Sequence, residues 1–275
     1  MINPDSCDRV RYLAFGVWFN FLLGHMNTIM ANVKVRLYVD HSLGEGQSVP
    51  VSRDKAHYLF SVMRMGPGDQ LFVINGKDGE YLAEIRDAGK RGGTLVCLAQ
   101  SRPLKMPPDL WLLFAPIKKA RTDFIVEKAT EMGASKILPV QTDFTNSERV
   151  RQDRLQAHAI EAAEQCAGTY VPEVLGLQKL DHLLDHWPSD RQLMFCDETL
   201  AGQANVLDPT TAPSWAILIG PEGGFSMRER DRLASFAAAH PVSLGPRILR
   251  ADTAVVAAMT LWQIRYGDWL SAGQT

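Results

Sequence analysis

Short runs with alternating apolar and polar positions follow one another from Val33 to about Leu98. The runs are "VKVRLYVD", "QLFVING", "EYLAEIRD" and "GTLVCLAQ", and turn residues separate them. Alternation with β-branched and aromatic residues is typical of half-buried strands. The intervening "NGKDGE" predicts a hairpin, because Asn-Gly and Asp-Gly accept positive φ at little cost. With one helical interval, "RDKAHYLFSVMRM", the pattern predicts a small, mostly antiparallel β-barrel.

The pattern changes after "RPLKMPPD", which we interpret as a linker. From there on, continuous apolar runs alternate with amphipathic segments. The runs are "LWLLFAP", "KILPVQ", "QLMFC", "WAILIG" and "VSLG". Continuous apolar runs are expected for a parallel sheet that is covered on both faces. The sequence therefore predicts a barrel domain over residues 31–104 and an α/β domain over residues 109–272.

The amphipathic segments have helical periodicity. In "KKARTDFIVEKATEMGA", Ile125, Ala129 and Met132 share one face, and Gly133 ends the predicted helix. The last predicted helix begins at about Thr253. Its apolar stripe consists of Val255, Met259, Trp262, Tyr266 and Trp269.

A further helical segment, "DRLQAHAIEAAEQCA", has two distinct faces. Its apolar stripe consists of Leu155, Ala159, Ala162 and Cys166. The opposite face consists of Arg154, His158, Glu161 and Gln165. We predict that the apolar stripe packs inward and that the polar face is solvated.

The first thirty residues need a separate interpretation. The apolar stretch "YLAFGVWFNFLLGHM" follows Arg9 and Arg11, which is the outline of a signal peptide. Asn20 and His25 interrupt it, however, and it is short for a membrane span. We interpret residues 1–30 as an extension outside the fold, with Met26 or Met30 as the working start.

Composition and charge narrow the function only slightly. A hydrophobic content of 46% over 275 residues is enough for a substantial core. Residues 31–108 hold 11 Lys+Arg against 8 Asp+Glu, whereas residues 109–275 hold 16 against 21. A basic excess this small permits binding to a phosphate backbone without requiring it. The cysteines show no metal-binding spacing and indicate a reducing cytoplasm; they are Cys7, Cys97, Cys166 and Cys196.

The stretch "LIGPEGGFS", residues 218–226, joins a predicted strand to a predicted helix. Ser226 and Glu229 have the spacing of a capping box, so we predict Ser226 as the N-cap. The loop therefore lies at the carboxyl end of a parallel strand, where open α/β sheets bind ligands. It matches neither G-x-G-x-x-G nor a P-loop, and Glu222 would repel a phosphate. By itself the loop fits either a ligand site or a tight turn.

A second loop, "VSLGPRILRADT", repeats the order strand, Gly-Pro, helix over residues 242–253. Arg247 and Arg250 precede the helix, for which we predict Asp252 or Thr253 as the cap. Two consecutive strand ends with exposed backbone can hold a flat ring between their main-chain N–H and C=O groups. Either arginine alone also fits a surface ion pair.

These two loops, in this order, resemble the SPOUT RNA methyltransferases, and more closely the 16S rRNA (uracil-N3)-methyltransferase family. "RTDFIVEKATEMGASKILPVQTDFT" and "IEAAEQC…VPEV" resemble two further signatures of that family. "VMRMGPGD" is similar to a landmark of its N-terminal domain. The resemblance extends from about Arg36 to Trp269, with four ordered motifs.

The resemblance implies a PUA-like or OB-like β-barrel for RNA, followed by an α/β SPOUT domain with a C-terminal trefoil knot. It also implies S-adenosylmethionine (SAM) as cofactor, a homodimer, and 16S rRNA or the 30S subunit as partner. The expected location is cytoplasmic, with neither a membrane nor a metal involved. Two alternatives stay open: another SPOUT methyltransferase that acts on tRNA, and an RNA-binding module without catalysis.

Carried over position by position, the resemblance assigns roles to individual residues. Arg250 is the leading catalytic candidate, with Glu222 beside it. The implied cofactor contacts are Leu218, Gly220, Glu222, Gly223, Leu244, Gly245, Ile248, Leu249 and Thr253. The implied RNA contacts are Arg36, Arg64, Lys118, Arg121 and Gln165.

These residue types suit the expected chemistry. Uracil N3 is a poor nucleophile while it keeps its proton, and an arginine near a uracil carbonyl can stabilise the anion. A carboxylate such as Glu222 can orient a donor or accept the proton. The target must be unpaired, because base pairing hides N3. The chain departs from the family at Gly168 and Tyr170, where basic residues are usual, and at Asp252, where glutamate is usual.

Overall fold

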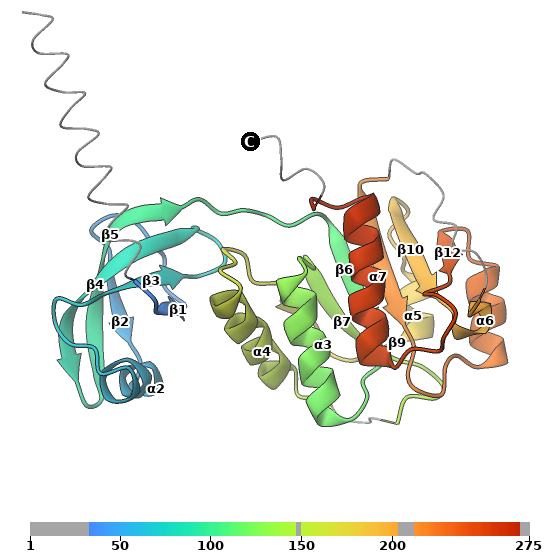
Figure 1. Cartoon of the computed structure of the whole chain (residues 1–275), viewed down its shortest axis with the longest axis horizontal. Coiled ribbons are helices and arrows are strands. Elements are labelled where there is room, and N and C mark those ends of the chain that lie inside the picture. The colour runs from blue at the N-terminus through green and yellow to red at the C-terminus, as the bar shows by residue number, and fades with distance from the viewer. Residues whose placement is uncertain (1–32, 147–149, 203–211, 270–275) are drawn as a thin grey trace, which may run out of the picture. The chain divides into compact units, whose positions relative to one another are not determined.

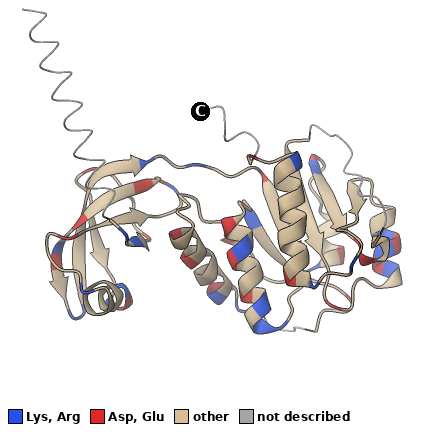
Figure 2. Cartoon of the chain, in the orientation of Figure 1, with Lys and Arg blue, Asp and Glu red and all other residues tan. Residues whose placement is uncertain are grey.

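The computed structural model describes residues 33–146, 150–202 and 212–269 (Figure 1). The proposed N-terminal extension and its alternative start residues lie outside these ranges. Internal contacts divide the chain into two compact units. Among the described residues, the first unit contains 33–73 and 81–101, and the second contains 74–80, 102–146, 150–202 and 212–269. Basic and acidic residues are interspersed over both units (Figure 2).

The first unit is built on a five-stranded sheet. Its strands are β1 (Arg36–Tyr38), β2 (Ser48–Val51), β3 (Gln70–Ile74), β4 (Glu80–Gly89) and β5 (Gly92–Arg102). They are hydrogen bonded in the order β1-β3-β4-β5-β2. Strand β2 was not predicted, because this short run contains Pro50; it occupies the edge of the sheet, where proline is tolerated.

Two local features connect these strands. The predicted hairpin between β3 and β4 is confirmed, and Asn75 Oδ1 closes its turn by accepting from the N–H groups of Lys77 and Asp78 at 3.0 and 2.8 Å. The predicted single helix was wrong in detail. A short α2 (Arg53–Ala56) continues as a π-helix, η1 (His57–Val62). This arrangement buries Leu59 completely in the core of the sheet.

The second unit contains a seven-stranded sheet. Its strands are β6 (Leu110–Phe114), β7 (Lys136–Gln141), β8 (Glu173–Val174), β9 (Gln178–Lys179), β10 (Arg191–Cys196), β11 (Ser214–Ile219) and β12 (Ala239–Val242). The order is β12-β10-β11-β6-β7-β8, with β9 paired to β7. The pairs are parallel, as predicted. The prediction of "VSLG" as a strand was wrong: β12 ends at Val242, and its sequence "AHPV" contains Pro241, which is tolerated in an edge strand.

Helices cover both faces of this sheet. One face packs against α3 (Lys119–Glu131), α4 (Gln152–Gln165) and α7 (Ala251–Arg265). The other face packs against α5 (Leu180–Asp185) and α6 (Met227–Ala234). No helix among the described residues is long and apolar enough to span a membrane. The covered sheet confirms the α/β class.

The helix ends agree with the sequence in one case and correct it in another. The capping box at Ser226 and Glu229 is present at the start of α6, as predicted. The predicted cap of α7 was wrong, because the helix begins at Ala251 with Arg250 as N-cap. Asp252 instead lies in the first turn, where a carboxylate favours the positive end of the helix dipole.

The polar face of α4 is solvated only in part: Glu161 and Gln165 are exposed, as predicted, whereas Arg154 and His158 are half-buried against α3. Arg154 forms an ion pair with the buried Asp123 of α3. His158 is half-buried, with its Nδ1 3.3 Å from Oε1 of Glu127, which is also on α3. Helix α4 therefore packs on α3 through polar as well as apolar contacts. Cys166, predicted to face inward, is exposed because it lies past the last turn of α4.

Candidate active site

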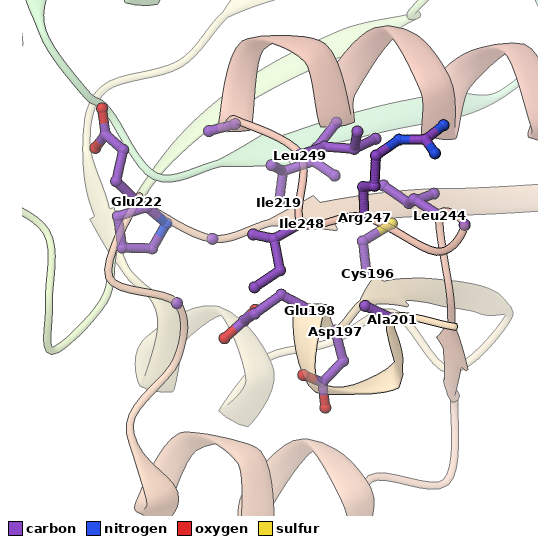
Figure 3. Close-up of a pocket in the computed structure, with 16 residues that line it drawn as sticks. Cys196, Asp197, Glu198, Ala201, Ile219, Glu222, Leu244, Arg247, Ile248 and Leu249 are labelled. Carbon is purple, nitrogen blue, oxygen red and sulfur yellow. The ribbon is translucent and has the colours of Figure 1, made fainter. Parts of the chain in front are cut away.

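A cleft lies at the carboxyl edge of the sheet, where β10, β11 and β12 end. It contains about 590 Å³ of empty space, part of which is open to solvent. Its walls come from three stretches, within residues 196–201, 219–224 and 244–254. Figure 3 shows Ile219, Ile248 and Leu249 close together on one side and Glu198 on the other.

The loop after β10 is fastened to the loop after β12. The N–H of Gly202 donates to the carbonyl of Gly245 at 3.1 Å. Asp197 Oδ1 accepts from the N–H of Thr199 at 3.0 Å and caps the short 3₁₀ turn η2 (Glu198–Leu200). Arg230 of α6 forms an ion pair with Glu198, which faces the cleft. The wall formed by residues 196–201 is therefore acidic, and contacts with Gly245 and Arg230 hold it in place.

Two glycines of the loop after β11, Gly220 and Gly224, have no room for a side chain. A Cβ on Gly220 would lie 2.8 Å from the ring of Phe225, which is itself buried. Gly224 has φ +69°, and a Cβ there would overlap the Glu198 carboxylate. Only glycine allows the loop to pass so close to its neighbours.

Arg121, in the first turn of α3, lies between the two loops that were predicted to bind the cofactor. Its Nη1 is 3.9 Å from Glu222 Oε1, and its Nε is 3.7 Å from Asp252 Oδ2. The guanidinium is about one-third exposed. The residue predicted to contact RNA phosphates therefore also joins Glu222 to the start of α7.

Most of the predicted cofactor residues meet at the cleft. Those that line it are Gly220, Glu222, Leu244, Gly245, Ile248 and Leu249. The other three do not: Leu218 is buried within β11, Gly223 packs against Phe144, and Thr253 is exposed in the first turn of α7. Arg250 is exposed between Leu249 and Ala251, which both line the cleft.

The predicted RNA contacts fall in both units. Arg36 lies over the ring of Phe72, at 5.7 Å from its centre, and Arg64 is exposed with φ +57°. Lys118 is the exposed N-cap of α3, and Gln165 is the exposed last residue of α4. Among the described residues, no group of three or more His, Cys, Asp or Glu is arranged to hold a metal ion.

The wall formed by residues 196–201 was not predicted from the sequence. The usable signal was the acidic pair Asp197-Glu198 directly after the apolar run "QLMFC", which is again a strand end. Cys196 begins this wall, and burial raises the pKa of its thiol. The thiol therefore stays neutral and acts as an apolar surface rather than as a nucleophile.

The loop after β7 is joined to the start of α6 beside the cleft. Glu229 Oε1 accepts from the N–H of Asp143 at 2.8 Å. The Asp143 carboxylate accepts from Ser226 Oγ at 2.6 Å and from Arg228 Nη2 at 2.9 Å. We call these residues, Asp143, Ser226, Arg228 and Glu229, the loop junction.

We predict that the loop junction stabilises the folded protein at neutral pH and loses this effect in acid. Hydrogen bonds from Arg228 and Ser226 lower the pKa of Asp143 below its ordinary value of 3.8. Because the folded state has the lower pKa, the contribution is present above pH 3.8 and is lost as the pH falls through the folded-state pKa. In urea unfolding followed from neutral pH to acid, Asp143→Asn should lose less stability over that window than the wild type. Asp231→Asn, on the exposed surface of α6, is the matched control; an Asp143→Asn profile that follows the wild type contradicts the prediction.

The fold and the cleft define a class of protein, the RNA methyltransferases. Residues 104–263 match the family described as the RNA methyltransferase domain, and residues 51–96 match the RNA methyltransferase PUA domain. The chain is 31% identical to the Ribosomal RNA small subunit methyltransferase E of Rickettsia conorii, over 82% of this chain and 93% of that one. The chain belongs to the family of ribosomal RNA small subunit methyltransferase E.

Two solved structures have the same fold. One is a ribosomal RNA small subunit methyltransferase E from Neisseria gonorrhoeae bound to S-adenosyl methionine, with 27% identity and a TM-score of 0.76. The other is a methyltransferase from Legionella pneumophila in complex with SAM, with 26% identity and a TM-score of 0.77. Each match covers 86% of this chain and 99% of the other. The family resemblance inferred from the four motifs is confirmed, as are the parallel-sheet α/β class and the PUA-like N-terminal domain.

Proposed function

We propose that this chain methylates N3 of a uridine in 16S rRNA of the small ribosomal subunit. Methylation of small-subunit rRNA with SAM as donor is the activity of its family. The single observation that carries the proposal is the cleft at the carboxyl edge of β10, β11 and β12, built by the two loops whose motifs identified the family.

The residues of the cleft fit SAM. This cofactor supplies a methyl group on a sulfonium, so the protein need not activate the donor. The apolar side chains of Ile219, Ile248 and Leu249 suit an aromatic ring, and Glu198 offers a carboxylate to hydroxyl or cationic groups. Gly220 and Gly224 let the loop pass close to Phe225 and Glu198 at the cleft.

The acceptor requires two further functions. Arg250 stabilises the negative charge that develops when uracil N3 loses its proton. Its exposed position between Leu249 and Ala251, which both line the cleft, supports this role. Glu222 accepts that proton or orients the base. Arg121 neutralises Glu222 and keeps it at the rim of the cleft. The chain therefore aligns donor and acceptor and balances charge, which is most of what a methyl transfer demands.

We propose the following roles for the two domains and the following assembly. Residues 31–104 bind RNA through Arg36 and Arg64, and residues 109–272 form a SPOUT domain whose C-terminal part is a trefoil knot. Lys118, Arg121 and Gln165 contact the RNA from the second unit. The enzyme acts as a homodimer in the cytoplasm, where its substrate is made.

The test uses 30S subunits and naked 16S rRNA from a strain that lacks the modification. Each is incubated with the protein and labelled SAM, and the labelled nucleoside is mapped by mass spectrometry. The expected product is a single N3-methyluridine. Label on tRNA alone, or on a carbon or ribose oxygen, contradicts the proposal, and SAM binding without transfer to any RNA indicates a module without catalysis.

A further inference from the structure

Phe144 is an aromatic side chain that is left partly exposed beside the cleft. It follows β7 at the same carboxyl edge of the sheet, and 47% of its surface is exposed. A Cβ built on Gly223 would lie 3.4 Å from Cβ and 3.7 Å from Cδ2 of Phe144. Gly223 directly follows Glu222, the proposed proton acceptor. Phe144 therefore lies against the residue between Glu222 and Gly224, which both line the cleft, and its partly exposed ring is close to the rim where the target base must arrive.

The turn that carries Phe144 is held firmly. Within it, the N–H of Thr142 donates to Thr145 Oγ1 at 2.9 Å, and the two hydroxyl oxygens are 2.8 Å apart. Asp143, the preceding residue, is fastened at the loop junction by three hydrogen bonds, of which one goes to the buried Glu229. These hydrogen bonds restrict the motion of the loop. They fix the position of an exposed ring, and an exposed ring in a fixed position has a low entropic cost of binding.

We propose that Phe144 is the stacking platform for the uracil that is taken out of the RNA stack. This inference rests on the proposed function, since only an unpaired base exposes N3 for methylation. Enzymes that act on such bases hold them by stacking on aromatic side chains and by hydrogen bonds to their Watson–Crick edge. Phe144 supplies the first contact, and Glu222, the residue before Gly223, is the group that we assign to the Watson–Crick edge.

The decisive experiment compares variants at this one position in the full-length enzyme. Phe144→Tyr keeps the ring, Phe144→Leu keeps apolar contact with Gly223 without a π-face, and Phe144→Ala removes both. The substrate is unmodified 30S subunits with labelled SAM. Base stacking on an aromatic residue is commonly worth a factor of about 10 to 100, so Phe144→Ala and Phe144→Leu should both lower kcat/KM for the subunit by about that factor. Phe144→Tyr should stay near wild type.

Three controls separate this role from others. Phe124→Ala removes another partly exposed phenylalanine of the same unit, on α3, and should leave kcat/KM unchanged. Calorimetry should give the same Kd for SAM in all Phe144 variants, and sedimentation should give the same oligomeric state. Full activity of Phe144→Leu overturns the inference, because it would mean that any apolar side chain suffices at this position and that the aromatic ring does not stack on the base. Weaker SAM binding or an altered oligomer in Phe144→Ala also overturns it, in favour of a cofactor or subunit contact. A wild-type enzyme that leaves uridine unmethylated refutes the proposed function itself, separately from these comparisons.

Discussion

Replacing Arg250 with alanine is expected to reduce methyl transfer by a factor of about 100 to 1,000 while the protein keeps its fold. Removing one preorganised group that stabilises developing negative charge usually has an effect of that size. Arg250 is the N-cap of α7, but its side chain makes no capping hydrogen bond. Its carbonyl accepts from the N–H of Ala254 at 2.7 Å, and alanine retains that main-chain bond. The substitution therefore removes the guanidinium and little else.

The measurement is single-turnover transfer from labelled SAM to unmodified 30S subunits, with thermal unfolding recorded in parallel. Arg265→Ala, in the last turn of the same helix, is the matched control, because Arg265 is also exposed and lies at the end remote from the cleft. The Arg250 variant should bind SAM as the wild type does, since Arg250 does not line the cleft. Equal turnover of the Arg250 variant and the wild type would remove this residue from the mechanism.

The sequence was most informative where a local rule and a family motif coincided. In "LIGPEGGFS", the spacing of Ser226 and Glu229 predicted the helix start, and the apolar run before it predicted the strand. These two boundaries place the loop at a carboxyl edge, and the second Gly-Pro loop then predicts a shared cleft. Such features depend on neighbours close in sequence, so periodicity and capping chemistry are enough to find them.

Other features depend on contacts between distant segments, which periodicity does not encode. Asp123 and Arg154 are on different helices, and their pairing makes the polar face of α4 a packing surface. The wall at residues 196–201 joins the cleft only because β10 lies between β11 and β12 in the sheet. The strand order, rather than any local motif, therefore determines that Glu198 faces Ile248 and Leu249.

Gly220→Ala is the second substitution with a large expected effect. The added Cβ would meet the Phe225 ring at 2.8 Å from Cε2 and 3.0 Å from Cζ. That ring cannot move aside easily, because it is 2% exposed and packs edge-on against Phe195 with ring centres 5.1 Å apart. Overpacking of this kind commonly destabilises a protein by about 1–3 kcal/mol.

The strain in this variant falls at the floor of the cleft, because Gly220 and the adjacent Ile219 both line it. Relief of the overlap must displace either the end of β11 or Phe225, so SAM affinity should fall by about tenfold or more, together with a lower Tm. Gly176→Ala is the matched control: its added Cβ would meet only Gln152 Oε1, at an ordinary 3.6 Å. Calorimetry and thermal unfolding test both expectations. If Gly220→Ala bound SAM as tightly as Gly176→Ala does, the end of β11 would have to be more compliant than its close packing implies, and Gly220 would not define the cofactor site.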